Sequence, residues 1–219
     1  MQITDAAPDI RVTELLCARL CHELVGPVGA VGNGLELLVE DPGDRQVVNM
    51  LVEAGAIAGR RLAFYRVAYG TAGGLPVSGR LDETRKLANG LITDGKVTAD
   101  WSGSATVSDL DLGLAGVKLL LNVFVIALEA LPRGGLIRVA MINSGGKLGI
   151  RLAASGPGAR LFPEQESALG GNLDVEQLTP RNIHVHYTAS HGATAGAAKL
   201  RLEKSADSIV LSTELPTGA

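Results

Sequence analysis

Apolar residues recur every three or four positions along the N-terminal third of the chain, which is the spacing of one helix face. In the first segment this apolar stripe consists of Cys17, Leu20, Leu24, Val31, Leu35 and Leu38. The residues Asp-Pro-Gly-Asp at 41–44 then interrupt the pattern with a strong turn signal. We therefore predict helices over about 9–39 and about 45–69, joined as an antiparallel hairpin.

The second predicted helix carries its own apolar stripe, which we expect to face inward: Val47, Leu51, Ala54, Ile57, Leu62 and Tyr65. A hairpin of two helices cannot bury its apolar faces alone. The simplest partner is a second copy of the hairpin, which would complete a four-helix bundle. The pattern therefore predicts a homodimer formed through residues of about 9–69.

The pattern changes after residues 70–76, whose Gly-rich composition is typical of a linker. We place the boundary so that 1–72 form the helical hairpin and 73–219 form a second domain. Further helices are predicted over 80–91, 109–131 and 180–191, and strands over 96–101, 136–141, 148–153, 200–203 and 209–214. This order predicts an α+β protein whose second domain is an α/β sandwich, with a mostly antiparallel sheet and helices on one face.

Composition narrows the function classes. The chain is 46% hydrophobic and 20% charged, enough to bury a core, and its net charge of −3 with no dense basic cluster argues against nucleic acid. Cys17 and Cys21 are the only cysteines, so a disulfide framework is excluded, and we expect both to be small core residues in a reducing compartment. The start is not a signal peptide, and the longest apolar run, 119–128, is too short to cross a bilayer. We expect a soluble, cytoplasmic protein without a membrane partner.

The candidate chemistry lies on the wet face of the first helix. At about 100° per residue, His22 points roughly 170° away from the apolar stripe, on the side that carries Gly26, Gly29 and Asn33. A lone histidine on a polar face is usually only solvated. The glycines and the internal Pro27 favour a function, because both weaken a helix and add nothing obvious to its stability. Small neighbours would let another macromolecule approach the imidazole.

Arginines are predicted at the same level of the hairpin. With the turn near residue 42, position 22 lies level with roughly position 63, which brings Arg60, Arg61 and Arg66 near the histidine. Surface arginines commonly serve only to solvate a helix, but three of them here could receive an acidic partner. We assign these three and Arg19 to a partner-binding set, together with Gly26, Gly29 and Asn33.

The chain resembles sensor histidine kinases, but it lacks their nucleotide motifs. Residues 22–27, His-Glu-Leu-Val-Gly-Pro, fit the H-box of the dimerisation and phosphotransfer domain. The kinase motif Asn-x-x-x-Asn has only its first residue here, Asn122, and Ile126 stands where the magnesium ligand should be. In the adenine-binding motif Asp-x-Gly-x-Gly, Ala154 replaces the Asp, and no glycine-rich phosphate loop precedes residue 180. We therefore expect no ATP, no metal and no other cofactor bound by this chain.

The combination of an intact H-box with a degenerate ATP-binding domain is similar to the ChpT-type histidine phosphotransferases of alphaproteobacteria. The resemblance spans essentially the whole chain and rests on residues 21–30 (CHELVGPVGA), 33–38 (NGLELL), 118–122 (KLLLN) and 129–135 (EALPRGG). It implies a homodimer with a four-helix bundle and a degenerate kinase-like domain on each chain. It also implies a shuttle that carries a phosphoryl group from the receiver of a hybrid kinase to response-regulator receivers, with the receiver supplying magnesium.

Two positions depart from the family, and several roles stay open. Glu23 stands where the family commonly has Asp, and Gly26 where a small hydroxyl residue is usual. We take His22 and Glu23 as the catalytic pair: Glu23 would hold the imidazole tautomer or accept its proton, although it could be only a solvated acid. Asn33 is either a hydrogen-bond donor to a partner or a plain polar residue. The remaining histidines are a weak candidate for metal binding: His184, His186 and His191.

Two other functions compete with the shuttle. A catalytically silent module that docks on and regulates a kinase or response regulator would not need its histidine. An ATP-dependent histidine kinase would need the nucleotide ligands that are missing at positions 126 and 154.

Overall fold

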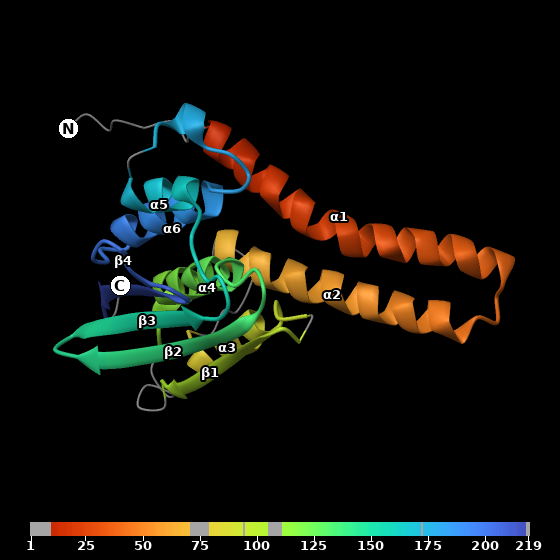
Figure 1. Cartoon of the computed structure of the whole chain (residues 1–219), viewed down its shortest axis with the longest axis horizontal. Helices are drawn as coiled ribbons and strands as arrows, with labels where there is room; N and C mark the ends of the chain where they lie inside the picture. The colour runs from red at the N-terminus through yellow and green to blue at the C-terminus, as the bar shows by residue number, and fades with distance from the viewer. Residues whose placement is uncertain (1–9, 71–78, 94, 105–110, 172, 218–219) are drawn as a thin grey trace.

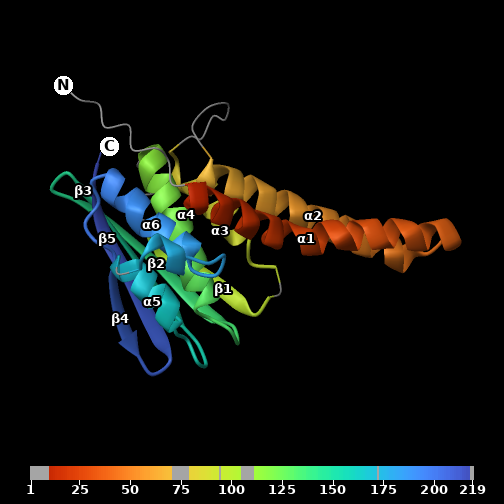
Figure 2. The same cartoon turned by 90° about the horizontal axis from the view of Figure 1, so that it is seen from above.

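A computed structural model of the chain describes residues 10–70, 79–93, 95–104, 111–171 and 173–217 (Figures 1 and 2). The predicted hairpin is present: α1 spans Ile10–Glu40 and α2 spans Arg45–Tyr69. The Asp44 carboxylate caps α2 by accepting the backbone N–H groups of Gln46 at 2.8 Å and Val47 at 3.2 Å. The hairpin extends well beyond the rest of the molecule (Figure 1).

The two helices approach each other closely at Gly34, which is buried. A Cβ atom at this position would lie 2.8 Å from Cδ2 of Leu51 on α2. Of the predicted inward residues, Ala54 and Tyr65 are buried. Cys17 and Cys21 are exposed, so the expectation that they are core residues is wrong for the single chain. Leu35 and Leu62 of the predicted stripes are also exposed.

The second unit contains a five-stranded sheet. Its helices are α3 (Leu81–Asn89), α4 (Gly113–Glu129), α5 (Pro163–Gly170) and α6 (Ile183–Thr194), with a 3-10 turn at Val175–Gln177. Its strands are β1 (Val97–Gly103), β2 (Gly135–Ser144), β3 (Lys147–Ser155), β4 (Arg201–Ser205) and β5 (Ser208–Pro216). The strand order is β1-β2-β3-β5-β4, and only the β1–β2 pair is parallel among the described strands.

The predicted α+β class is therefore confirmed, with helices gathered on one face of the sheet (Figure 2). The sequence analysis missed α5, because a helix of eight residues shows too little apolar periodicity to be recognised. Residues 116–127 of α4 are all buried, which explains the long apolar run as a core helix. Phe124 of α4 stacks on Trp101 of β1 with ring centroids 5.8 Å apart.

The end of α2 shares the core of the second unit. Phe64, Tyr65, Val67 and Ala68 belong to the same buried cluster as α4 and the sheet. The ring of Tyr69 meets that of Tyr187 on α6 edge-on, with centroids 5.4 Å apart. Most of the predicted linker lies outside the described residues, so the boundary at 72/73 stays a prediction. The hairpin and the second unit are nevertheless packed together at this end.

Candidate functional site

His22 lies on the exposed face of α1, where the helical spacing placed it. Its side chain is 83% exposed, and its Nδ1 lies 3.9 Å from Oε1 of Glu23. Gly26 and Gly29 are exposed on the same side, and an added Cβ at either would meet nothing within 4 Å. Asn33 is exposed one turn further. Among the residues that the structure describes, no packing requires these two glycines, and their smallness leaves open space beside His22.

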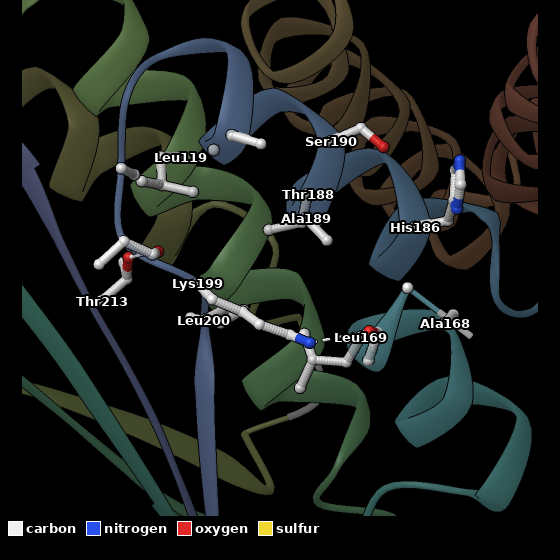
Figure 3. Close-up of a pocket in the computed structure, with 16 residues that line it drawn as sticks. Leu119, Ala168, Leu169, His186, Thr188, Ala189, Ser190, Lys199, Leu200 and Thr213 are labelled. Carbon is white, nitrogen blue, oxygen red and sulfur yellow. Dashed lines mark hydrogen bonds between the residues drawn. The ribbon is translucent and has the colours of Figure 1, made fainter. Parts of the chain in front are cut away.

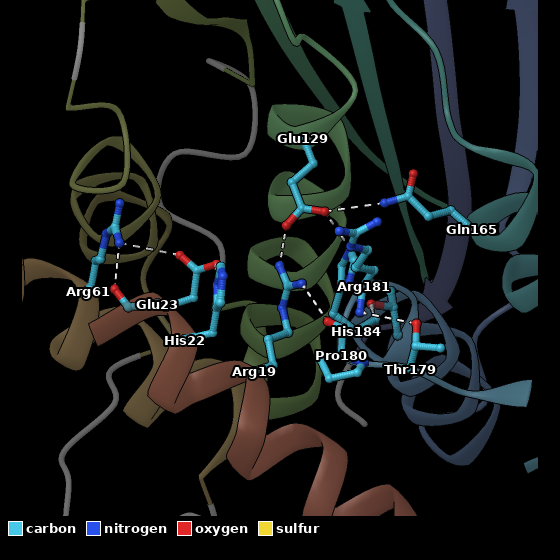
Figure 4. A network of polar contacts seen from close by, with 11 residues as sticks. Arg19, His22, Glu23, Arg61, Glu129, Gln165, Thr179, Pro180, Arg181 and His184 are labelled. Carbon is cyan, nitrogen blue, oxygen red and sulfur yellow. Dashed lines mark hydrogen bonds and ion pairs between the residues drawn. The ribbon is translucent and has the colours of Figure 1, made fainter. Parts of the chain in front are cut away.

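Pro27 deprives the carbonyl oxygen of Glu23 of its helical hydrogen bond, and Arg61 replaces it. Nη1 of Arg61 donates to the Glu23 carbonyl oxygen at 2.5 Å and lies 3.5 Å from the Glu23 carboxylate (Figure 4). One guanidinium therefore satisfies the freed carbonyl and holds the acid beside the histidine. The predicted proximity of Arg61 to position 22 is confirmed, although its main contact is within the chain.

The other predicted arginines lie in different surroundings. Arg60 and Arg66 are exposed on α2 and stay candidates for partner binding. Arg19 is only 5% exposed, and its guanidinium binds inside the chain. A buried guanidinium cannot meet a docking partner without breaking these contacts, so we correct the assignment of Arg19 to the partner-binding set.

Arg19 belongs to a polar network that joins α1 to three helices of the second unit (Figure 4). Its Nη2 pairs with Oε1 of Glu129, the last residue of α4, and its Nη1 donates to the carbonyl oxygen of Pro180 at 3.1 Å. Oε2 of Glu129 lies 3.1 Å from Nε2 of His184 on α6 and accepts from Nε2 of Gln165 on α5 at 3.3 Å. Sequence reasoning missed this network, because its members are far apart in the chain.

The network has a defined protonation state near neutral pH. Burial would raise the pKa of the Glu129 carboxyl, but the hydrogen bond from His184 and the charge of Arg19 lower that pKa to about 2. Burial lowers the pKa of His184 more than Glu129 raises it. The arrangement that follows is an Arg19–Glu129 ion pair beside a neutral His184, whose Nε2 lies 3.1 Å from the Glu129 carboxylate.

A cleft of about 1010 Å³ separates α1 from the second unit next to this network. His22 and Glu23 line one wall, and residues 179–182 line the opposite wall. Arg181 is exposed on that second wall. Sequence analysis could not single out Arg181, because only the fold brings residues 179–182 opposite the histidine.

The degenerate nucleotide positions are filled by packed side chains. Ile126 and Ala154 are both fully buried, and the Asn122 amide donates to the carbonyl oxygens of Ala68 and Lys118 at 3.1 and 2.8 Å. Asn122, Ile126 and Glu129 follow one another at helical spacing along α4. The stripe that carries nucleotide ligands in kinases thus bears an isoleucine and a carboxylate here.

The remaining histidines do not gather around a common point suited to a metal. His184 is committed to Glu129, and Nε2 of His191 lies 3.4 Å from the carbonyl oxygen of Ala115. Within the described residues, no group of three or more His, Cys, Asp or Glu side chains could hold a metal ion. A second cavity of about 370 Å³ lies between α4, α5 and α6, lined mainly by apolar side chains, and Lys199 at its edge donates to the Gly170 carbonyl oxygen at 2.9 Å (Figure 3).

Comparison with known proteins decides the family. Residues 81–208 match the family described as the histidine phosphotransferase C-terminal domain. Protein phosphotransferase ChpT of Brucella abortus (strain 2308) is 31% identical over 200 residues, which cover 91% of this chain and 93% of the relative. The chain belongs to the ChpT-type histidine phosphotransferases.

Solved structures agree with this membership. A bacterial phosphotransferase structure superposes with a TM-score of 0.80 at 29% identity, covering 94% of this chain and 96% of the other. The Acinetobacter baumannii histidine kinase AdeS gives a TM-score of 0.49 at 8% identity over 90% of this chain and 98% of its own, too low to support an argument. As a ChpT-type phosphotransferase, the chain pairs a helical hairpin with the α/β unit of that family and belongs to two-component signalling.

Proposed function

We propose that this protein is the shuttle of a phosphorelay. His22 accepts a phosphoryl group from the receiver-domain aspartate of a hybrid histidine kinase and passes it to the receivers of response regulators. The observation that carries the proposal is an 83% exposed imidazole on a helix face whose neighbouring glycines leave open space. A receiver is a folded domain, so its aspartyl phosphate reaches the histidine only if nothing bulky stands beside it.

The chemistry needs little more than this geometry. Phosphoryl transfer depends mainly on in-line positioning and charge stabilisation, and the receiver supplies magnesium. A ring proton held on Nδ1 toward Glu23 leaves the Nε2 lone pair free to attack. The Nε2–P bond then forms as the P–O bond to the aspartate breaks, which restores the aspartate carboxylate. Rotation of the exposed His22 side chain would shorten the 3.9 Å gap to Glu23.

We further propose that the second unit uses no ATP and that the chain needs no cofactor of its own. Ile126 offers no oxygen to magnesium, and Ala154 offers no carboxylate to adenine. The ionised Glu129 adds a negative charge to the same stripe, which would repel nucleotide phosphates. Calorimetric titration with Mg-ATP should give no heat above background, and binding at micromolar affinity would contradict this proposal.

The assembly proposed for the shuttle is a homodimer in the cytoplasm. The hairpin exposes large apolar side chains on both helices: Val25, Val28, Leu35, Leu37 and Val39 on α1, and Val48, Met50, Val52 and Leu62 on α2. A surface of this kind marks an interface. By length and by a mean hydropathy of 1.2, α1 also qualifies as a membrane span. Because Arg19 in the first third of α1 pairs with Glu129 of the second unit, we assign the apolar surface to a second copy.

Transfer of label from a phosphorylated receiver tests the shuttle. The protein should acquire label that is labile to acid and stable to alkali, as expected of phosphohistidine. The His22→Ala protein should fold and dimerise as the wild type does, because the side chain contacts no core, and should take up no label. Regulation of a kinase that survives this substitution would instead favour the silent docking module.

A further inference from the structure

The Arg19 network is unusual because it places charge where apolar packing would serve stability as well. Arg19 and His184 are buried, and Glu129 lies between them. Replacing a buried ion pair by apolar side chains is often neutral or stabilising, so such a pair is weak evidence of a stability role. Hydrogen bonds differ from apolar contacts in that they fix direction as well as distance. The network is therefore better suited to fixing the relative positions of the elements that it joins than to adding stability.

Its connections show which geometry is fixed. The two Nη groups of Arg19 bind the end of α4 and the backbone at Pro180, so one guanidinium joins α1 to α4 and to the turn 179–182. The Glu129 carboxylate extends the link to α5 and α6. Nearer its N-terminus, α1 is held by Arg11, which donates to the carbonyl oxygens of Val175 at 3.0 Å and Leu178 at 3.2 Å. The segment 175–182 is thus tied to α1 by two arginines.

The tied segment includes the wall that faces His22 across the cleft. Arg19 lies three residues before His22, so the network fixes the second unit directly beside the phosphoryl acceptor. A kinase has to bring a nucleotide to its histidine, whereas a shuttle without nucleotide gains from a wall that stays in place. A receiver docked on α1 would then meet a cleft of constant width.

We propose that Arg19, Glu129 and His184 are positioning residues for phosphoryl transfer, which lock the second unit against α1 so that the turn 179–182 forms a fixed second wall for the docking receiver. The inference rests on the proposed function, in which a receiver docks at His22. It assigns no chemical step to these side chains, since none of them touches the reacting atoms.

Two sets of substitutions in the whole chain test whether the network holds the second unit against α1. Arg19→Lys keeps a positive charge beside Glu129, but a single ammonium lacks the planar fork that binds Glu129 and Pro180 together. The paired change Arg19→Met with Glu129→Leu removes both charges and fills the site with apolar groups. The matched control is Lys204→Met with Glu166→Leu, which removes an ion pair of 2.8 Å between β4 and α5, away from α1.

The first readout separates docking from chemistry. We measure transfer from a phosphorylated receiver against receiver concentration, and labelling of His22 by phosphoramidate, a small donor that needs no docking surface. Both Arg19 variants should raise KM for the receiver about tenfold, with kcat within about twofold of wild type. Their phosphoramidate rates should equal the wild-type rate, and the control should match the wild type in every respect.

The second readout does not depend on activity. Backbone hydrogen exchange in the segment 175–182 should accelerate in both Arg19 variants and stay unchanged in the control, because only the variants remove one of the two arginine contacts that tie the segment to α1. An unchanged exchange rate in the Arg19 variants would show that the network does not hold the segment against α1, which overturns the inference. Faster exchange with an unchanged KM would show that the network positions nothing for the receiver, which also overturns the inference.

Two further results distinguish this inference from the proposed function. If the wild-type protein takes no label from any phosphorylated receiver, the proposed function fails and the inference falls with it. If the wild type transfers normally but the phosphoramidate rate falls in the variants as much as the receiver rate does, the proposed function stands. In that case the network acts on the imidazole itself, and the inference alone is overturned.

Discussion

At the residue scale, the site combines an exposed histidine with neighbouring residues whose contacts could not be predicted from their residue type alone. Arg61 looks like a surface cation in the sequence, yet its Nη1 donates to the Glu23 carbonyl that Pro27 leaves unpaired. The proline and the arginine therefore form a compensating pair across the hairpin. Gly29 has no such partner in the part of the chain that the structure describes, because an added Cβ would meet nothing within 4 Å.

Gly29→Leu tests whether the open surface beside Gly29 is where a receiver docks. The helix should keep its stability or gain about 1 kcal/mol, since glycine is the poorer helix former. Transfer from a phosphorylated receiver should fall sharply, because a leucine two turns from the imidazole would keep the aspartyl phosphate beyond in-line reach. Transfer rates and thermal unfolding, measured beside wild type and His22→Ala, check both parts. Normal transfer by Gly29→Leu would show that the glycines have another purpose.

The network predicts how stability depends on pH. The pKa of His184 is lowered by burial, so protonation favours the unfolded chain once the pH falls below the ordinary value of 6.5. The pKa of Glu129 is lowered from 4.5 to about 2, so its contribution is present above pH 4.5 and is lost as the pH falls toward 2.

The free energy of unfolding should therefore decline below pH 6.5 and decline further below pH 4.5, the second part by at most about 3 kcal/mol. Denaturant unfolding at a series of pH values measures the curve. In Glu129→Gln the decline below pH 4.5 should be shallower than in wild type. An identical curve would show that the carboxyl is not coupled to folding.

At the element scale, the contact between α1 and α2 depends on a glycine that the sequence analysis did not single out. Gly34 is buried where α1 and α2 approach each other. Gly26 and Gly29, which lie on the same helix, are next to open space. The same residue type thus serves close packing at one position and leaves a surface bare at another. Only neighbouring atoms tell the two apart.

Gly34→Ala should lower the free energy of unfolding by about 1 kcal/mol. Its Cβ would lie 2.8 Å from Cδ2 of Leu51, so the leucine has to shift, and this cost outweighs the gain in helix propensity. Gly29→Ala is the matched control, where open space leaves only the propensity gain. Denaturant unfolding of both proteins checks the sign, and a stabilised Gly34→Ala protein would mean that Leu51 moves aside freely.

At the scale of the whole molecule, the proposed homodimer would cover the apolar surface of the hairpin. Leu35 is 55% exposed in the single chain although it belongs to the predicted apolar stripe. Leu35→Asp should therefore leave the fold of each chain intact and convert a dimer to monomers, because a charge without a partner in a bundle core is costly. Light scattering at tens of micromolar measures the mass, with Glu53→Ala as an exposed control. A monomeric wild type would refute the bundle.

Much of this protein could be predicted from its sequence because the decisive signals are local. Helical spacing located the hairpin to within one residue at each end of α1, and it placed His22 on the exposed face. The substitutions at Ile126 and Ala154 could be read directly, since a metal or adenine ligand is defined by its own functional group. The H-box, 22–27, and the signature 129–135 indicated the family that the comparisons confirm.

The tertiary structure decided what depends on residues far apart in the chain. Arg19 and Glu129 are 110 positions apart, so no periodicity could reveal that they pair or that Arg19 is buried. The exposure of Cys17 and Cys21 also escaped the pattern, because an apolar stripe shows that a face is to be covered but not which surface covers it. The sequence by itself determined the elements and the chemistry of single side chains. The fold alone determined which of those side chains meet, because such contacts depend on how the elements pack.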